Sequence, residues 1–512
     1  MIKKIIMYFY RYKETLIFLA CVLLVFSHTI TNEIVSWDEA TYILAGQSLV
    51  DGNLPYSDIW EMKPPLVYFL YAIPIKLFPD SLYSIRFFGF FIIFIVSLQI
   101  NNIFKFYRLY DLNIVLVLFF ISLMSYQFWL YPTTELLALP FLLGSLILLR
   151  NFEKKHNILI AGLLMGLAVL VRSNLALLAI CLPIFYLIIY KKEYGFKEAF
   201  LNSLRFITGG LIILLGLLAI YFFYNSIDIL IASNINVLLV YSSEFSILDS
   251  INKYSKTFFK MIYFYPHLFL PFLIAIIYFL FICKNSSIPK KNKSFINLVL
   301  FYIMIILVSV IISRQGFSHH LIQLIPFVII LFAFFIHKKN KYFVVLSYNF
   351  KLTILAVLLL SIFKSVLVFQ NTESLDYRIR DFSLEIKPLI DKNDIVLALD
   401  YHIIYWYLRE DIKIPTPIAH TPALVRKSSK DRIKPLEKVG VVEENHIENV
   451  LNKKPSIIIC STRICIEGRS NLDNNRIKSL LLGYKEIRRI ENTTLWEFTK
   501  KSSMIVYQRK DE

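Results

Sequence analysis

The chain has 512 residues, of which 57% are hydrophobic and only 18% charged, and its mean hydropathy is +0.60. This composition excludes a disordered chain, a disulfide scaffold and a collagen-like fibre, and it indicates a polytopic membrane protein. The formal net charge of +18 would by itself suggest a nucleic-acid partner, but the positions of the cations along the chain give a different explanation.

Membrane spans are predicted from the apolar runs, because a helix needs about 20 mostly apolar residues to cross the hydrocarbon core of a bilayer. Eleven runs approach that length: 15–31, 84–104, 113–130, 134–149, 158–171, 173–190, 206–224, 262–283, 295–313, 319–337 and 352–369. No small-residue cleavage site follows the first run, so we interpret it as a span rather than a cleavable signal peptide.

The orientation follows from the loop cations, because cytoplasmic loops are enriched in Lys and Arg. With a cytoplasmic N-terminus, the inner loops hold 21 Lys and Arg residues and the outer short loops hold seven. The positive charge is therefore mainly a topogenic signal. Membrane lipids are expected partners, and nucleic acid is not.

This topology predicts a transmembrane domain over 1–370 and a periplasmic α/β domain over 371–512. The transmembrane domain has a first external loop at 32–83 and a second at 225–261. Within the first loop, the apolar segment 65–79 is too short to span and contains Pro74, so it is expected to lie along the membrane interface.

The tail has more charges and shorter apolar runs than the rest of the chain. Segments 394–400 and 455–461 are predicted to be buried strands, and 473–482 a helix. Segments 485–491 and 494–500 are predicted to form a final strand pair. Cys460 and Cys465 are compatible either with a disulfide or with two free thiols.

The spans contain almost no ionisable residues at depth, which argues against ion-coupled transporters and proton pumps. Polar groups gather in the outer loops instead. Asp38 and Glu39 follow the first span directly, and Lys63 lies between Glu61 and two prolines that fix the backbone. A lysine held in this way can bind a phosphate as a point charge. The other candidates at the outer face are Arg86, Glu135, Arg172, Arg314, His319 and His320.

Three segments of the first loop carry a family resemblance: 38–42 (DEATY), 52–56 (GNLPY) and 63–72 (KPPLVYFLYA). They resemble the first external loop of C-type (GT-C) membrane glycosyltransferases of the protein O-mannosyltransferase and aminoarabinose-transferase type. Three later segments show weaker similarity: Ser84-Ile85-Arg86, Thr134-Glu135-Leu136-Leu137 and the segment from His319 to Pro326. The likeness therefore covers about the first 340 residues.

The resemblance implies an enzyme that takes a sugar from a polyprenyl-phosphate carrier at the outer membrane face. It implies that Asp38 is the catalytic acidic residue, Glu39 its supporting neighbour and Lys63 a contact to the carrier phosphate. Two departures stand out. Met62 separates Glu61 from Lys63, where relatives have Glu directly before Lys-Pro-Pro, and Arg172 occupies a turn where many relatives have Thr-Lys.

The chemistry can also be argued from the residue types. A glycosyl phosphodiester leaves as a stable anion, so one carboxylate that takes the acceptor proton suffices. Cations near the leaving phosphate stabilise the developing charge. We expect Asp38 to be the base of an inverting transfer, with Lys63, and Arg172 or Arg314, binding the phosphate. A divalent metal ion is compatible with this site, but no sequence feature requires one.

The sequence therefore predicts an all-α GT-C-like membrane domain of about eleven helices with an extracytoplasmic α/β tail domain. The predicted activity is that of a hexosyl or pentosyl transferase acting on a lipid, glycan or protein acceptor of the cell envelope, in a bacterial inner membrane. Two alternatives remain: a transport or binding protein for lipid-linked glycans, and a surface-polysaccharide polymerase or ligase.

Overall fold

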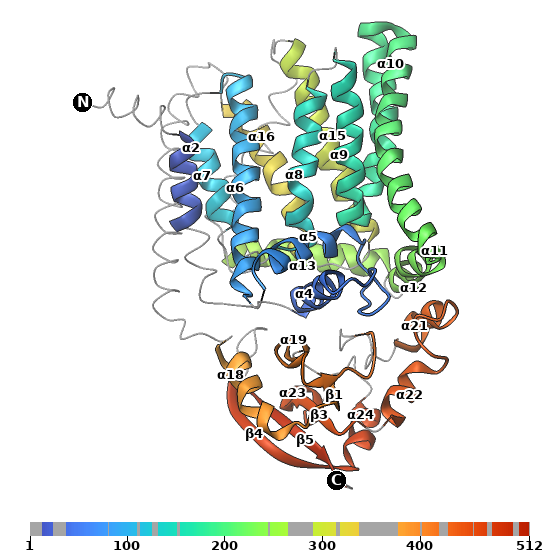
Figure 1. Cartoon of the computed structure of the whole chain (residues 1–512). Helices are drawn as coiled ribbons and strands as arrows, with labels where there is room; N and C mark the ends of the chain where they lie inside the picture. The colour runs from blue at the N-terminus through green and yellow to red at the C-terminus, as the bar shows by residue number, and fades with distance from the viewer. Residues whose placement is uncertain are drawn as a thin grey trace, which may run out of the picture. The chain divides into compact units, whose positions relative to one another are not determined.

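The structure of the chain is a computed structural model. It describes residues 13–23, 37–79, 81–109, 113–124, 132–150, 154–243, 246–264, 290–313, 318–336, 377–399, 402–418, 429–453, 455–467, 474–494 and 501–510 (Figure 1).

The chain forms two compact units. The helical unit consists of Met1–Thr29, Arg86–Ala219 and Phe245–Asn371. The loop–tail unit consists of Ile30–Ile85, Ile220–Glu244 and Thr372–Glu512. The first external loop and the tail, which the sequence places at opposite ends of the chain, thus belong to the same unit.

Long apolar helices build the helical unit, and several of them run side by side (Figure 1). The elements, two of which extend into the other unit, are α2 (Lys13–Cys21), α6 (Tyr83–Phe106), α7 (Asn113–Met124), α8 (Thr134–Leu149), α9 (Lys155–Val171), η2 (Ser173–Leu175), α10 (Ala176–Phe223), α13 (Ile247–Phe264), α15 (Lys290–Ile312), η4 (Ser318–Leu324) and α16 (Ile325–Ile336). Helices α6, α8, α9 and α15 coincide closely with predicted apolar runs. The runs 173–190 and 206–224 lie on the two sides of a break in α10 at Gly195, whose φ is 78°.

Within the described residues, three helices are long and apolar enough to cross a membrane: Tyr83–Phe106, Gly195–Phe223 and Asn292–Ile312. A fourth is added if Ile227–Ser243 and Ile247–Lys256, which meet at 82°, are counted as one broken span. The predicted external loop 225–261 is thus largely helical. The chain is a membrane protein, whereas the number of eleven spans stays a prediction, because 352–369 and most of 262–283 lie outside the described residues.

Glycines allow α9 and the second half of α10 to pack at close range. A Cβ atom added at Gly162 would overlap the carbonyl oxygen of Phe206, and one added at Gly209 would overlap that of Leu159. Without a hydrophobic driving force between helices in lipid, close backbone approach at small residues is a main source of helix association. These two glycines therefore fix the distance between α9 and α10.

The part of the loop–tail unit that precedes the tail in sequence is helical, with α4 (Trp37–Val50), α5 (Leu66–Leu77), α11 (Ile227–Ile231), η3 (Ala232–Asn236) and α12 (Val237–Ser243). The tail adds α18 (Tyr377–Ile386), η5 (Lys387–Leu389), β1 (Asp394–Ala398), α19 (Ile404–Leu408), β2 (Ile412–Lys413), α21 (Ser429–Glu437), α22 (His446–Asn452), β3 (Ile457–Ser461), α23 (Thr462–Cys465), α24 (Asn474–Leu481), β4 (Tyr484–Thr494) and β5 (Lys501–Arg509).

The tail strands form a mixed sheet in the order β2-β1-β3-β5-β4. Strand β1 pairs in parallel with β2 and β3, whereas β5 is antiparallel to β3 and β4. Strand β3 is buried throughout, and the last three residues of β1 are buried, as expected for the apolar runs predicted at 394–400 and 455–461. Helix α24 corresponds to the helix predicted at 473–482.

The last strand differs from the prediction. The partner of β4 is Lys501–Arg509, which follows the predicted segment 494–500. Met504, Ile505 and Val506 are buried in it, so the apolar stretch that meets β3 comes later in the chain than the aromatic segment on which the prediction rested. Residues 495–500 lie outside the described part.

The two tail cysteines are joined. Cys460 at the end of β3 and Cys465 at the end of α23 form a disulfide, with a Cα–Cα distance of 6.3 Å. The bridge ties α23 to the sheet, and it decides between the two states that the sequence left open.

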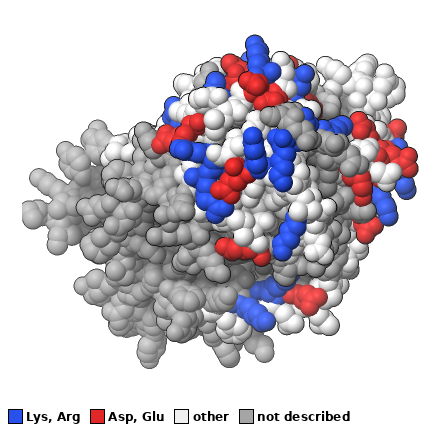
Figure 2. Space-filling model, turned by 90° about the horizontal axis from the view of Figure 1, so that it is seen from below, with Lys and Arg blue, Asp and Glu red and all other residues white. Residues whose placement is uncertain are grey.

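Cationic and anionic side chains lie close together on the face shown in Figure 2. The tail has exposed ion pairs of the same kind, such as Lys453–Glu443 at 3.3 Å and Arg489–Glu486 at 2.7 Å. The described residues drawn on that face thus mix both signs, as solvated protein surfaces do.

The glycine contact between α9 and α10 gives a matched test. Gly162→Ala places a methyl group against the Phe206 carbonyl and should lower stability by about 1–3 kcal/mol, the usual cost of overpacking. Gly216→Ala should be neutral or stabilising, since a Cβ there meets nothing within 4 Å and alanine favours a helix. Thermal unfolding of both variants in detergent measures the difference. Equal unfolding temperatures would show that the close approach does not control stability.

Candidate functional site

Asp38 and Glu39 lie in the first turn of α4, where the helix dipole stabilises negative charge. Their environments differ. Glu39 is fully buried, whereas Asp38 is half-buried. Asp38 is therefore the more accessible carboxylate of this pair.

Helices α4 and α5 pack closely against each other. A Cβ atom at Gly46 of α4 would lie 3.0 Å from the Cβ of Tyr71 in α5, and the Tyr42 and Tyr71 rings meet edge to face at 5.5 Å. Pro65 precedes α5 with a φ of −68°, a value suited to a helix start. This packing holds the turn before α5, which contains Glu61 and Lys63, relative to the start of α4.

Two buried tyrosines hold the backbone of that turn. The Tyr56 hydroxyl donates to the Lys63 carbonyl oxygen at 2.7 Å, and the Tyr68 hydroxyl donates to the Glu61 carbonyl oxygen at 2.8 Å. Burial raises the pKa of both phenols well above the usual value, so both remain protonated donors. Tyr56 has a φ of 75°, a region that costs a non-glycine residue energy. Its burial and hydrogen bonds offset that cost.

Other parts of the loop–tail unit hold the same turn. The Trp60 indole N–H donates to the Ser233 hydroxyl at 3.0 Å, and the Trp60 backbone N–H donates to the Pro417 carbonyl oxygen at 2.8 Å. The Asn234 side chain donates to the Tyr56 hydroxyl at 2.9 Å. The turn is thus fixed by residues from two distant stretches of the chain.

Glu61 is the electrostatic centre of this arrangement. Its side chain is buried, and burial raises the pKa to about 7. The charge of Lys63 opposes this rise, the charge of Asp38 adds to it, and Arg432 lowers the pKa slightly. The charges of Asp38 and Lys63 therefore both act on Glu61, and we refer to these three residues as the loop cluster.

Sequence reasoning missed two tail residues that bear on the loop cluster. His402 is buried, and its Nε2 lies 2.8 Å from the Thr41 hydroxyl, one turn after Asp38. Arg432 is buried with its guanidinium 4.2 Å from the centre of the Tyr241 ring, a cation–π contact. Neither lies in a recognisable motif, because tertiary contact alone brings each to the loop.

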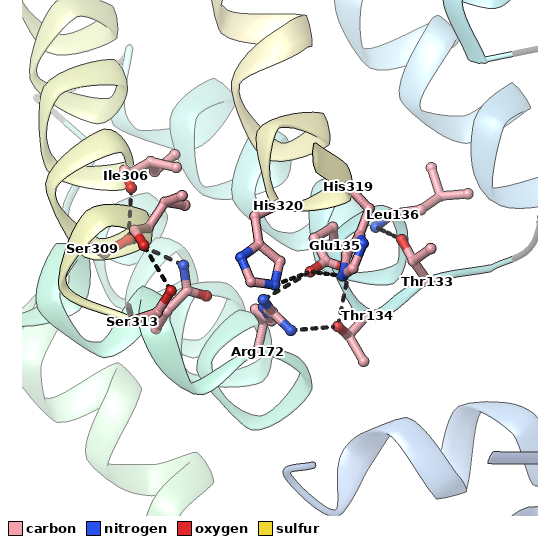
Figure 3. Close-up of polar contacts among 12 residues, drawn as sticks. Thr133, Thr134, Glu135, Leu136, Arg172, Ile306, Ser309, Ser313, His319 and His320 are labelled. Atoms are coloured by element: carbon pink, nitrogen blue, oxygen red, sulfur yellow. Dashed lines mark hydrogen bonds and ion pairs between the residues drawn. The ribbon is translucent and has the colours of Figure 1, made fainter. Parts of the chain in front are cut away.

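A second cluster lies in the helical unit (Figure 3). The Thr133 hydroxyl caps α8 by accepting from the Leu136 N–H at 3.1 Å, which places Glu135 in the first turn. Arg172 ends α9, and its Nη2 lies 2.8 Å from Glu135 Oε1. Its Nη1 donates to the Thr134 hydroxyl at 3.1 Å. Both partners of the ion pair are buried, and each neutralises a charge that would be costly alone.

Two histidines complete the second cluster. In Figure 3 both imidazoles turn toward the Glu135 carboxylate. His319 Nε2 lies 3.8 Å and His320 Nε2 3.7 Å from Glu135 Oε1. The Tyr254 hydroxyl lies 2.8 Å from His320 Nδ1. We refer to Glu135, Arg172, His319 and His320 as the histidine cluster.

The predicted site residues thus fall into two groups, each inside one unit. Asp38, Glu61 and Lys63 belong together, as do Glu135, Arg172, His319 and His320. Arg86 is buried near the start of α6 in the helical unit, and Arg314 lies outside the described residues. Because Arg172 already pairs with Glu135, its charge is largely neutralised within its own cluster, whereas Lys63 is half-buried beside a carboxyl group that is partly protonated near neutrality.

No protein-family model matches the chain, and no curated protein matches its sequence. Among solved structures, the chain is similar to ArnT from Cupriavidus metallidurans bound to undecaprenyl phosphate, with a TM-score of 0.59 and 12% sequence identity. The match covers 97% of this chain and 98% of that chain. The resemblance to GT-C transferases of the aminoarabinose-transferase type, expected from the first loop, is confirmed as a likeness of fold over nearly the whole chain.

Glu61 gives a pH-dependent prediction. Its pKa is about 7 in the fold, against an ordinary value of 4.5, so the folded state holds the proton more tightly. The associated stability is present below pH 4.5 and lost as the pH rises through 7, by up to about 3 kcal/mol. Glu61→Gln should therefore flatten the fall in unfolding temperature between pH 5 and pH 8, whereas the exposed control Asp51→Asn should leave it unchanged. Parallel profiles for wild type and Glu61→Gln would contradict the raised pKa.

Proposed function

We propose that the protein is an inverting glycosyltransferase. It moves a hexosyl or pentosyl group from a polyprenyl-phosphate carrier to a cell-envelope acceptor at the outer face of a bacterial inner membrane. The acceptor is a lipid, a glycan or a protein. The observation that carries the proposal is the full-length likeness of fold to ArnT, a protein solved with undecaprenyl phosphate, together with the loop cluster in the segment that resembles GT-C first loops.

The loop cluster fits this reaction. Asp38 removes the proton from the acceptor hydroxyl as its oxygen attacks the anomeric carbon of the sugar. The bond from that carbon to the phosphate oxygen breaks on the opposite side, and the configuration inverts. The electron pair of the broken bond leaves with the carrier phosphate, which is a stable anion, so no general acid is needed. Glu39, buried behind Asp38, supports its position.

Lys63 is the residue that we assign to the carrier phosphate. Two tyrosine hydrogen bonds fix its backbone, so its ammonium group starts from a defined point. An ammonium group stabilises the negative charge that develops on the leaving phosphate. Glu61 beside it is partly protonated at neutral pH, and therefore offsets the lysine charge less than an ordinary carboxylate would.

The outward orientation of the tail is supported by two independent features. The loop cations favour a cytoplasmic N-terminus, and the Cys460–Cys465 disulfide is the state expected in an oxidising compartment such as the periplasm. Both features agree with a reaction on the extracytoplasmic side.

The catalytic proposal is tested in the source organism. We compare glycolipids, polysaccharides and glycoproteins by mass spectrometry in a deletion strain complemented with wild type, Asp38→Asn or the control Asp51→Asn. Asparagine cannot accept the proton of the acceptor hydroxyl, so Asp38→Asn should abolish transfer. A single sugar mass should therefore be missing with Asp38→Asn and present with Asp51→Asn. That missing mass identifies the sugar and its acceptor. If Asp38→Asn restores the glycan, the carboxylate is not the base, and a lipid-linked glycan carrier becomes the better interpretation.

The role of Lys63 is tested by binding. Purified Lys63→Gln should bind undecaprenyl phosphate about 10-fold or more weakly than wild type, because a hydrogen bond to a charged group contributes about 1.5–3 kcal/mol. Lys76→Gln is the matched control, since Lys76 is exposed near the other end of α5. Equal affinity of the two variants would remove Lys63 from the phosphate site.

A further inference from the structure

The histidine cluster brings three metal-ligating groups together. Within the described residues, Glu135, His319 and His320 place one carboxylate oxygen and two imidazole nitrogens within 4.8 Å of one another. They come from two separate elements, the first turn of α8 and the 3-10 segment η4. Two histidines and one glutamate are a ligand set of catalytic zinc sites, which keep a fourth position open.

The two spacings between Glu135 and the histidines are close to those of a formed site. Around a tetrahedral zinc ion, with bonds of about 2.0–2.1 Å, ligand atoms lie roughly 3.3 Å apart. Glu135 Oε1 lies 3.8 Å from His319 Nε2 and 3.7 Å from His320 Nε2. Both distances exceed that spacing by about half an ångström, and all three ligand atoms lie within 4.8 Å of one another. A bound ion would therefore draw the two imidazoles toward the carboxylate and toward each other.

The surroundings of His320 resemble the outer shell of a metal ligand. A ligating histidine almost always hydrogen-bonds through its other ring nitrogen, which fixes the tautomer. Here His320 Nδ1 lies 2.8 Å from the Tyr254 hydroxyl. With the Nδ1 proton donated to that hydroxyl, the Nε2 lone pair faces Glu135. His319 is a quarter exposed, whereas Glu135 and His320 are almost wholly buried, so His319 marks the accessible side.

The charges of the histidine cluster indicate that a metal ion would bind there together with an anion. Glu135 and Arg172 neutralise each other at 2.8 Å, and the imidazoles that ligate a metal are neutral. A divalent ion would therefore add two positive charges to the four described residues of the cluster, whose one carboxylate is already paired, and placing charge in a mostly buried site is costly. An anion at the open position removes that cost, and the Arg172 guanidinium beside it suits a phosphate oxygen.

We propose that Glu135, His319 and His320 bind a divalent transition-metal ion of the zinc class, whose fourth position takes a phosphate oxygen next to Arg172. These residues belong to the helical unit, whereas the loop cluster belongs to the loop–tail unit, and the proposed metal binding does not depend on the proposed transferase activity.

The test is a Co²⁺ titration of the purified full-length protein in detergent after treatment with EDTA. Wild type should bind one equivalent and give the intense visible absorption of four-coordinate cobalt. His319→Ala should bind at least about 10-fold more weakly, as should Tyr254→Phe, because loss of an outer-shell partner typically costs 10–100-fold. His156→Ala, which removes an exposed histidine outside the cluster, should bind like wild type.

Two further outcomes decide the proposal. Inorganic phosphate, or undecaprenyl phosphate in a separate arm, should strengthen Co²⁺ binding, and the arm with the larger effect distinguishes free phosphate from a lipid headgroup. If neither phosphate changes the affinity for Co²⁺, the proposal that an anion occupies the fourth position is wrong. Absence of the cobalt band in wild type, or equal affinity in wild type, His319→Ala and Tyr254→Phe, would overturn the metal site itself. Tyr254→Phe keeps the ring volume, so its result does not depend on tolerance of a cavity.

Discussion

The loop–tail unit depends on the buried hydrogen bonds that hold the turn between Glu61 and Lys63. Tyr56 and Tyr68 donate to its carbonyl oxygens, and Trp60 bonds both to Ser233 and to the tail at Pro417. Buried polar groups left without partners are costly, so these bonds determine one conformation of the turn. That conformation places the half-buried Lys63 beside Glu61 and Asp38.

Burial gives that turn its chemistry as well as its shape. The same desolvation that keeps the tyrosine hydroxyls protonated raises the pKa of Glu61 to about 7. A group that changes charge near neutral pH next to a lysine and a second carboxylate is typical of functional sites. The tail contributes through Arg432 and His402, so the loop cluster is a property of the whole unit and not of the first loop alone.

In the helical unit the main constraint is the lipid environment, in which polar groups must be satisfied within the protein. Gly162 and Gly209 bring the α9 and α10 backbones close together, and at the end of α9 Arg172 neutralises the buried Glu135. Two histidines face this carboxylate, and the three side chains together can ligate a metal ion. A metal with a bound anion fits there without leaving uncompensated charge.

The sequence by itself determined the membrane class, the helices α6, α8, α9 and α15, the buried strands β1 and β3, and the likeness of the first loop to GT-C transferases. These features follow from local hydrophobic runs and from a motif within one short segment, which the sequence displays directly. Only the tertiary structure decided that the first loop shares a unit with the tail, that Arg432 and His402 meet it, and that the last strand is Lys501–Arg509. It also showed that Arg172 pairs with Glu135, and that Cys460 bonds to Cys465. Such contacts depend on the packing of residues up to 361 positions apart, as with Thr41 and His402, and no local pattern encodes which distant side chain will fill a given buried position.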